Sequence, residues 1–426
     1  MISALSERFG PRLSKLKDAY WRMFSIKEIE NDVAVRLFGG AVLIGFLVSF
    51  KNWEGNWGTT IMAKLNGSAL CWPTFQSCYN WIFMDARPEG YTQNTIFMLM
   101  LGVIFLAAYA LLSKKYTLAH VSIFILFLWK LYVTSISYRY SANYDYYQTS
   151  FTIIFLFLPH KRFFGSLAVV TFYFLSTATK IHETWTLGTY FTSMKTGLPI
   201  FPKWATLFLT NLVIFMEMIA AWFLFSKNKF LQRTVFFFFA VFHLYSGTLV
   251  GYHYPTIVTP SLLIFFGPLF KPFDTVPNGI KSFPGWCFFL FLFSMQMLSH
   301  TIPGDEKLTL EGNFYGLYMF EANHQCSVRI ADENDNAIFR YDSASARDRC
   351  DPYRYWFRIK HTYCEQNKGA KYSFKMTHSI NGGPFYMIVN EPDLCALEYK
   401  PFSKNDWIKT EKEAQPMARP RQNYYR

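Results

Sequence analysis

The chain has 426 residues, of which 51% are hydrophobic, 20% aromatic and only 17% charged. Soluble domains carry charge on about 25% of their residues, so this composition favours a polytopic membrane protein over a soluble enzyme. The formal net charge is +13. This charge does not indicate nucleic-acid binding, because the basic excess lies in the apolar part of the chain, where topology and attraction to anionic lipid explain it.

Nine apolar runs are candidate membrane spans, because a bilayer core about 30 Å thick needs about 20 apolar residues of helix. They lie at approximately 33–51, 95–113, 117–137, 148–159, 164–182, 204–226, 231–252, 256–270 and 281–299. The fourth and eighth are short, and Pro159 and Pro268 interrupt them. The predicted fold is therefore an α-helical polytopic membrane protein of about nine spans.

Basic residues in the short loops predict the orientation of these spans. With nine spans that start inside, the cytoplasmic side carries 15 Lys and Arg residues and the opposite loops carry six. This predicts a cytoplasmic amino terminus and an extracytoplasmic carboxyl terminus, in a bacterial inner membrane or in the endoplasmic reticulum. Residues 1–32 are interpreted as an interfacial segment on the cytoplasmic face, and residues 33–303 as the membrane domain.

Residues 304–426 have a different composition, with β-leaning runs such as "CSVRIAD" and "PFYMIVN" between turn clusters such as "DENDN" and "INGGP". This pattern predicts a small, mostly β domain outside the membrane. Of the seven cysteines, six fall on the predicted extracytoplasmic side: Cys71, Cys78, Cys326, Cys350, Cys364 and Cys395. Their even number predicts disulfides, although spacing leaves the pairing of the last four open.

Four ionisable positions in the predicted spans are candidates for chemistry, because insertion of a charge costs on the order of 3 kcal/mol and therefore needs a reason. They are Lys130, Lys180, Glu217 and His243. Lys130 is interpreted first as a lysine whose long stem reaches the membrane surface. Lys180 lies near the outer end of its span, where the same interpretation competes with burial. Burial disfavours the charged form of an amine, and a neutral amine can act as a general base.

Glu217 and His243 lie in the middle of two consecutive predicted helices. An acid and a histidine on antiparallel helices could face one another and offset the cost of burying both, and such a pair could equally serve only to fix helix register. His243, Ser246 and Gly247 share one helical face, and Gly247 lets a neighbouring helix or a flat ring approach closely. The sequence contains no HExxH or CxxC motif, so no metal site is predicted.

The order of these residues resembles the membrane domain of the vitamin K-dependent gamma-carboxylase family, also called the horizontally transferred transmembrane (HTTM) domain. The matching positions are Lys180, Trp185, Gly188, Glu217 and "FH" at Phe242-His243, together with "AVRLFGG" in the first span, Asn143 in "YRYSANYDYYQ", and "NFYGLYMFEANHQCSVRIADENDN" after the last span. The resemblance covers approximately residues 30–345.

This resemblance implies helices around a cavity that opens to the lumenal side, where a reduced quinone and a substrate glutamate meet. It places Lys180 as the base that deprotonates vitamin K hydroquinone or another reduced quinone. Oxygen then attacks, and the strong base that forms removes a proton beside a Glu side chain before carbon dioxide adds. Glu217 and His243 would complete the catalytic set, and the implied cofactor-binding residues are Asn143, Tyr144, Trp185, Ser246 and Gly247.

The chain departs from the family at three positions. Thr179 stands where a second Lys usually precedes the base, Tyr144 where a His usually follows the Asn, and Ser246 where an Asn is usual. These departures concern the glutamate-carboxylating half of the reaction more than the quinone half. Two other classes therefore stay open: a non-redox membrane protein that binds, matures or exports a secreted peptide, and a structural lipid- or partner-binding protein. The expected partners are the lipid bilayer and a secreted peptide or small-molecule substrate.

Overall fold

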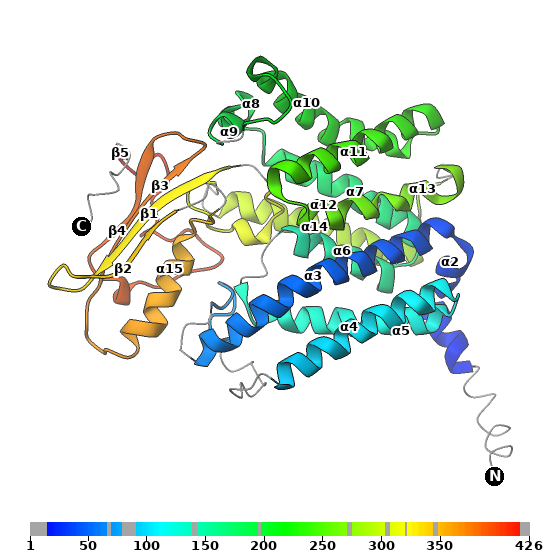
Figure 1. The fold of residues 1–426 in the computed structure, drawn as a ribbon, viewed down its shortest axis with the longest axis horizontal. Helices are drawn as coiled ribbons and strands as arrows, with labels where there is room; N and C mark the ends of the chain where they lie inside the picture. The colour runs from blue at the N-terminus through cyan, green and yellow to red at the C-terminus, as the bar shows by residue number, and fades with distance from the viewer. Residues whose placement is uncertain are drawn as a thin grey trace, which may run out of the picture.

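The computed structural model describes residues 15–65, 70–78, 91–138, 143–194, 197–270, 275–302, 307–319, 322–343 and 348–417. Within these ranges the chain is mostly helical, and a small antiparallel sheet follows the helices in sequence. Figure 1 shows that the sheet lies beyond one end of the helical bundle, which we call the sheet end.

The bundle begins with a helical segment over residues 15–23 and continues through helices of very different length. Their bounds are α2 Ile26–Asn31, α3 Val33–Leu65, α4 Tyr91–Leu112, α5 Tyr116–Ser135, α6 Asn143–Phe157, α7 Lys161–Ala178, α8 Glu183–Thr186, α9 Thr189–Thr192, α10 Thr206–Met218, α11 Lys229–Val250, α12 His253–Ser261, α13 Leu263–Phe270 and α14 Phe283–Thr301. A 3₁₀ segment at Ala220–Phe225 lies between α10 and α11.

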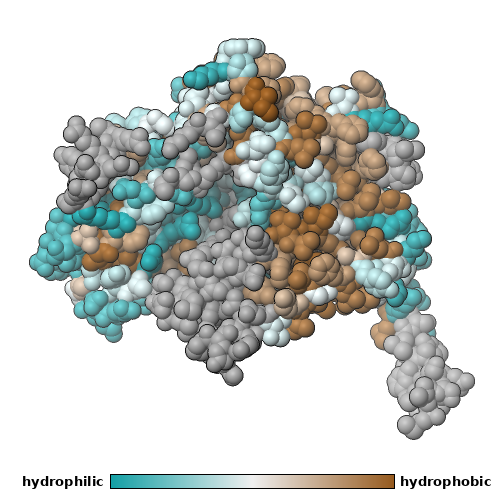
Figure 2. Space-filling model, in the orientation of Figure 1, coloured by the Kyte–Doolittle hydropathy of each residue, from teal (hydrophilic) through white to brown (hydrophobic). Residues whose placement is uncertain are grey.

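Five stretches of the described helices are long and apolar enough to cross a membrane. They are Val33–Phe50, Thr95–Leu112, Tyr116–Ser135, Lys203–Phe225 and Ile280–Thr301. Large apolar side chains also point outward from the bundle, such as Phe105 at 59% exposure and Phe208 at 65%. Figure 2 shows this apolar surface over much of the helical part and a hydrophilic surface over much of the sheet part. These features suggest that the helices insert in a membrane.

The predicted count of nine spans is not confirmed and stays a prediction. The run expected at 148–159 forms α6, which has 15 residues and so extends only about 22 Å at 1.5 Å per residue. The run expected at 256–270 is divided between α12 and α13, which meet at Leu262 next to Pro260. The runs at 164–182 and 231–252 correspond to α7 and α11.

Helix α7 lies inside the bundle and positions the candidate site. It packs against α3, α6, α10, α13 and α14, and most of its side chains are buried. Small residues make close approach possible at this centre: a Cβ added to Gly285 of α14 would lie 2.2 Å from Cζ of Phe164. Because α7 ends at Ala178, the residues that follow it emerge at the sheet end.

The amino-terminal segment that was predicted to lie in the interface packs against α5 over its described part. Trp21 donates from Nε1 to Thr117 Oγ1 at 2.8 Å, and the Tyr20 hydroxyl lies 2.6 Å from His120 Nδ1. Ile26 and Ile29 of α2 are buried in the same core as the bundle. Residues 1–14 of this predicted segment lie outside the described residues.

The sheet has the strand order β2-β1-β3-β4-β5, and every pairing is antiparallel. Its strands and the helix that packs on it are β1 His324–Ala331, β2 Ala337–Asp342, α15 Pro352–Ile359, β3 Ser373–Ile380, β4 Phe385–Glu391 and β5 Pro416–Met417. Alternate residues such as Val328 and Met376, which are register partners, point into a core shared with α15. The predicted boundary at 303/304 lies outside the described residues.

Three disulfides confirm the prediction made from the cysteine count. The pairs are Cys71–Cys78, Cys326–Cys350 and Cys364–Cys395, and Cys287 of α14 is free and exposed. The first pair shares the core of the sheet, because Cys71 and Cys78 are buried against the same apolar cluster as Cys326 and Cys350. Disulfides persist in oxidising compartments, so the three pairs suggest that the protein reaches such a compartment.

Candidate functional site

A buried ion pair joins the end of α7 to the middle of α10. Lys180 follows α7 in a turn in which its backbone N–H donates to Thr177 O at 2.8 Å. Its Nζ lies 2.6 Å from Oε2 of Glu217, and both residues are 2% exposed. Thr177 Oγ1 donates to the same carboxylate oxygen. The ammonium and the hydroxyl together offset the cost of burying this carboxylate.

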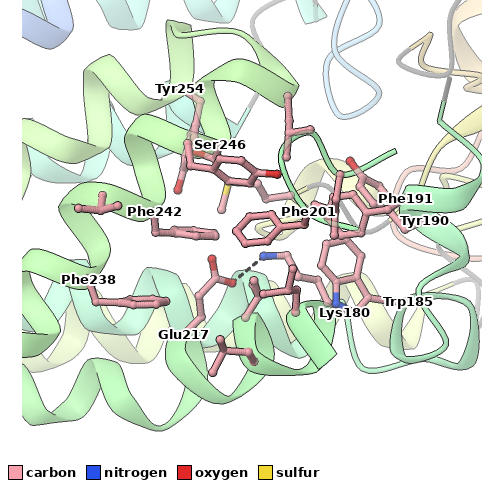
Figure 3. Close-up of a pocket in the computed structure, with 18 residues that line it drawn as sticks. Lys180, Trp185, Tyr190, Phe191, Phe201, Glu217, Phe238, Phe242, Ser246 and Tyr254 are labelled. Carbon is pink, nitrogen blue, oxygen red and sulfur yellow. Dashed lines mark hydrogen bonds and ion pairs between the residues drawn. The ribbon is translucent and has the colours of Figure 1, made fainter. Parts of the chain in front are cut away.

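The ion pair borders an apolar cavity of about 230 Å³. Its wall is formed by residues from α8–α9, the 198–201 loop, α10, α11, α12 and the segments that follow α7 and α14: Lys180, Trp185, Tyr190, Phe191, Leu198, Phe201, Leu209, Leu212, Val213, Glu217, Phe238, Val241, Phe242, Tyr245, Ser246, Leu249, Tyr254 and Met319. Figure 3 shows the Lys180 and Glu217 side chains pointing toward one another, with aromatic rings on either side of them. The site thus combines two charged groups with an almost entirely apolar surrounding.

The short helices α8 and α9 form an aromatic wall of this cavity. Trp185 and Tyr190 are nearly inaccessible to solvent, with 2% and 1% exposure. The Lys180 ammonium lies 5.5 Å from the centre of a Trp185 ring, within the range of a cation–π contact. Gly188 turns the chain between the two helices at a φ of 77°, where an added Cβ would lie 3.0 Å from Thr206 Cγ2. The motif Lys180–Trp185–Gly188 therefore has a structural basis in this wall.

His243 does not pair with Glu217, contrary to the first interpretation of the sequence. Its Nε2 is hydrogen-bonded to the Tyr173 hydroxyl of α7, and the two rings are stacked with their centres 5.7 Å apart. Glu217 instead bonds Lys180 and Thr177, because the end of α7 comes between the two predicted partners. His243 is buried behind the cavity wall rather than on it.

The two residues that follow His243 on its helical face have separate roles. Ser246 lines the cavity, and its hydroxyl donates to His243 O at 3.0 Å. Gly247 is not among the residues that line the cavity, but it does allow a flat ring to approach closely, one of the two alternatives that the sequence left open. The ring is that of Tyr252, which would lie 2.4 Å from an added Cβ.

Asn143 and Tyr144 are not among the residues that line the cavity. The Asn143 side chain accepts a hydrogen bond from Tyr318 N at 3.1 Å, which ties the start of α6 to the segment after α14. Tyr144 packs on His253, with ring centres 4.2 Å apart. Both contacts fix the chain at the sheet end of the bundle.

Lys130 is part of a second buried polar group. Its Nζ donates to Gln148 Oε1 at 2.6 Å and lies 3.4 Å from Asp145 Oδ1. Ser49 of α3 also donates to Gln148 Oε1, at 2.7 Å. Lys130 is 0% exposed, so the interpretation that its stem reaches the membrane surface is wrong. None of these residues lines the cavity beside Lys180.

Sequence reasoning missed Asp145, Thr177, Tyr173 and the aromatic residues Tyr190 and Tyr254. A signal was present for Asp145, since an intramembrane lysine needs a partner and an acid stands nearby at the start of the next helix. The others are ordinary residues of apolar runs, and only their positions in space distinguish them.

The described residues contain no group of three or more His, Cys, Asp and Glu side chains that could hold a metal ion. No family model, curated protein or solved structure matches this chain. The arrangement itself can hold and transfer protons: a carboxylate and an amine in contact, shielded from water, border a space large enough for a small ring.

Proposed function

We propose that the chain is an integral membrane enzyme related to the vitamin K-dependent gamma-carboxylases, in which Lys180 is the base that takes a proton from a hydroquinone-type cofactor. The observation that carries the proposal is the Lys180–Glu217 pair, buried beside an apolar cavity. A reduced quinone is the implied cofactor because it is lipid-soluble and presents an acidic hydroxyl on a flat ring. When bound, it supplies the hydroxyl proton and the electrons for reaction with oxygen.

The size and the lining of the cavity support a flat ring as the bound group. Its volume of about 230 Å³ lies slightly below the 300 Å³ or so at which ligand pockets usually begin. Its walls are rich in aromatic side chains, whose faces suit a flat ring. The polar groups of Lys180 and Glu217 then provide a point at which a hydroxyl group is bound and oriented.

The Lys180–Glu217 pair as a whole carries no net charge, so it can accept one more proton. Lys180 Nζ lies 2.6 Å from Glu217 Oε2, so the ammonium can first pass a proton to the carboxylate, and the neutral Nζ can then accept the proton of a bound hydroxyl. The pair then carries one positive charge, which balances the negative charge left in the cavity. The Trp185 ring stabilises the ammonium, and the apolar walls exclude water that would screen the interaction.

The proposal includes the orientation expected from the loop charges: nine spans, a cytoplasmic amino terminus and an extracytoplasmic sheet. The disulfides support it, since all three lie at the sheet end of the molecule. The substrate modified on that side is a peptide or a small molecule, with Glu carboxylation as one outcome.

A second candidate is the non-redox protein that binds, matures or exports a secreted peptide. The observation that favours it is the use of Asn143 and Tyr144, at positions matched to the carboxylase pattern, in contacts within the chain rather than on the cavity. The two candidates differ in whether the Lys180 pair performs chemistry.

Turnover of vitamin K hydroquinone by the purified protein in lipid nanodiscs tests the proposal. Wild type is expected to form the epoxide, and Lys180→Met to lose this activity by at least about 100-fold, the usual minimum for a general base. Lys130→Met is the matched control, because Lys130 is an equally buried, ion-paired lysine away from the cavity. Epoxide formation without fixation of labelled carbon dioxide into a Glu-containing peptide supports the quinone half alone. No turnover by folded wild type favours the second candidate.

A further inference from the structure

The aromatic wall of the cavity is held in place from the sheet side. Helices α8 and α9, which carry Trp185, Tyr190 and Phe191, lie between the bundle and the start of β1 and the end of β3 (Figure 1). The segment after α14 also reaches the cavity, since Met319 lines it. The sheet and the candidate site are therefore in direct contact.

Two asparagines form a reciprocal pair at this junction. Asn323 precedes β1 and Asn381 follows β3. Asn381 N donates to Asn323 O at 2.9 Å, and Asn323 N donates to Asn381 Oδ1 at 2.8 Å. They are only 2% and 5% exposed, so hydrogen bonds that they make are protected from competing water.

The side-chain amides of this pair bind both ends of the α8–α9 segment. Asn381 Nδ2 donates to Thr184 Oγ1 at 2.8 Å, at the start of α8. Asn323 Nδ2 donates to Tyr190 O at 2.5 Å and to Ser193 Oγ at 3.1 Å, at the end of α9. Within α8–α9, Trp185 and Tyr190 face the cavity, so these bonds fix the position of the wall beside Lys180.

The backbone at this point requires a residue such as asparagine. Asn381 has a φ of 51°, a left-handed conformation that Asn and Gly adopt with least strain. Gly382, at φ 74°, approaches so closely that an added Cβ would lie 3.3 Å from Ser193 Cβ. Glycine at position 381 would satisfy the backbone, but it would lose both side-chain hydrogen bonds.

We propose that Asn323 and Asn381 are positioning residues, through which the C-terminal sheet holds the wall of the Lys180 cavity and sets access to it. This inference rests on the proposed function, in that it takes the cavity to be the reaction site. A client that engages the sheet near these residues would thereby act on the cavity without touching it.

Access to the cavity can be measured with a single thiol. Cys287 is the free cysteine and the other six are paired, so Ser246→Cys in a Cys287→Ser background places one reactive thiol in the cavity wall. Asn381→Gly is expected to raise the rate of labelling by a water-soluble maleimide about tenfold, equivalent to about 1.4 kcal/mol. Asn381→Asp, which keeps the acceptor for Asn323 N but loses the donor to Thr184, should fall in between.

Asp335→Gly is the matched control. Asp335 also has a left-handed backbone, with a φ of 62°, in the turn between β1 and β2, and its side chain bonds Arg329 rather than the helical part. Its substitution should leave the labelling rate unchanged. Equal acceleration by Asp335→Gly, or none by Asn381→Gly, would overturn the proposal.

Thr184→Val supplies a second variant if Asn381→Gly does not fold, because it removes the same hydrogen bond from the helical side. The expected result is again faster labelling, and an unchanged rate contradicts the proposal. The assay needs no turnover, so its outcome is separable from the failure of the quinone chemistry. Where turnover is observed, the Asn381 variants should raise KM for the hydroquinone more than they lower kcat, which a general loss of folded protein would not do.

Discussion

Lys180 Nζ lies 2.6 Å from Oε2 of Glu217, and this contact joins the turn after α7 to α10 at the edge of an apolar cavity. The contact has two consequences. It makes the burial of a lysine tolerable, and it places an exchangeable proton next to a space that a flat ligand can enter. A lysine at the membrane surface would provide neither.

Removal of one partner of this pair should destabilise the protein strongly. Lys180→Met leaves the Glu217 carboxylate buried with only the Thr177 hydroxyl, and loss of one partner of a buried pair typically costs about 3–5 kcal/mol. The double variant Lys180→Met/Glu217→Leu should recover most of this loss. Thermal unfolding in nanodiscs measures the series. Lys404→Met, in an exposed pair with Glu413, is the control and should change stability by no more than about 1 kcal/mol. A double variant less stable than both single variants would contradict the argument.

The sequence predicted the candidate site in part. The cost of an intramembrane charge identified Lys180 and Glu217 as candidates. Their order along the chain with Trp185 and Gly188 then assigned both residues to one candidate site. The sequence did not reveal that they pair with each other, because the partner of a helical residue depends on how each helix is rotated in the bundle. For the same reason, the sequence interpretation gave Glu217 as the partner of His243, whereas its hydrogen-bond partner in the structure is Tyr173.

The fold shows the same limits. The apolar runs predicted helices near their observed positions, and their lengths marked the fourth and eighth runs as short, but they did not show that the eighth run is divided into two helices, α12 and α13. The cysteine count predicted disulfides, but it left the partner of Cys326 open, and that partner is Cys350 in the segment between β2 and α15. The hydrogen bonds of Asn323 and Asn381 had no signal in the sequence, since asparagine in a turn is ordinary.

The packing of α14 on α7 gives a second prediction. A Cβ added to Gly285 would lie 2.2 Å from the ring of Phe164, which is 0% exposed. Gly285→Ala should therefore lower the free energy of unfolding by about 1–3 kcal/mol, and Phe164→Leu should restore part of it. Gly102→Ala in α4 is the control: nothing lies within 4 Å of its added Cβ, so the higher helix propensity of alanine should leave stability equal or improved. Equal losses at the two glycines would refute the packing explanation.

The disulfides predict the reactivity of the thiols. In the native protein one thiol, Cys287, should react with a membrane-permeant maleimide, and six more should react after unfolding and reduction. Mass spectrometry of the intact chain counts the adducts. Cys287→Ser should abolish labelling without reductant. A second adduct on native, unreduced protein would show that at least one of the three pairs is not formed.

The sheet should lose stability in acid because of a buried histidine pair. His324 Nδ1 lies 3.1 Å from His378 Nε2 in adjacent strands. Burial lowers the pKa of His378 from 6.5 to about 4, and burial together with the neighbouring His378 lowers the pKa of His324 as well. The unfolded state therefore binds more protons, so this stability is fully present above pH 6.5 and is lost as the pH falls through about 4. Hydrogen exchange of the β1 and β3 amides measures the loss, which should be smaller in His378→Gln.

Glu311 should have the opposite effect on the same part of the protein. Burial raises the pKa of its carboxyl from 4.5 to about 7, although Asn405 donates to Oε1 from both its backbone N and its Nδ2 at 2.8 Å. Because the folded pKa is the higher one, the stability that Glu311 contributes is present below pH 4.5 and is lost as the pH rises through about 7. Glu311→Gln keeps an oxygen for Asn405 and carries no charge, so it should slow hydrogen exchange around Asn405 at about pH 8, where the buried carboxylate is most costly. At about pH 4 it should make little difference. Faster exchange in the variant at the higher pH would mean that the charged carboxylate stabilises this region, and would reverse the sign of the argument.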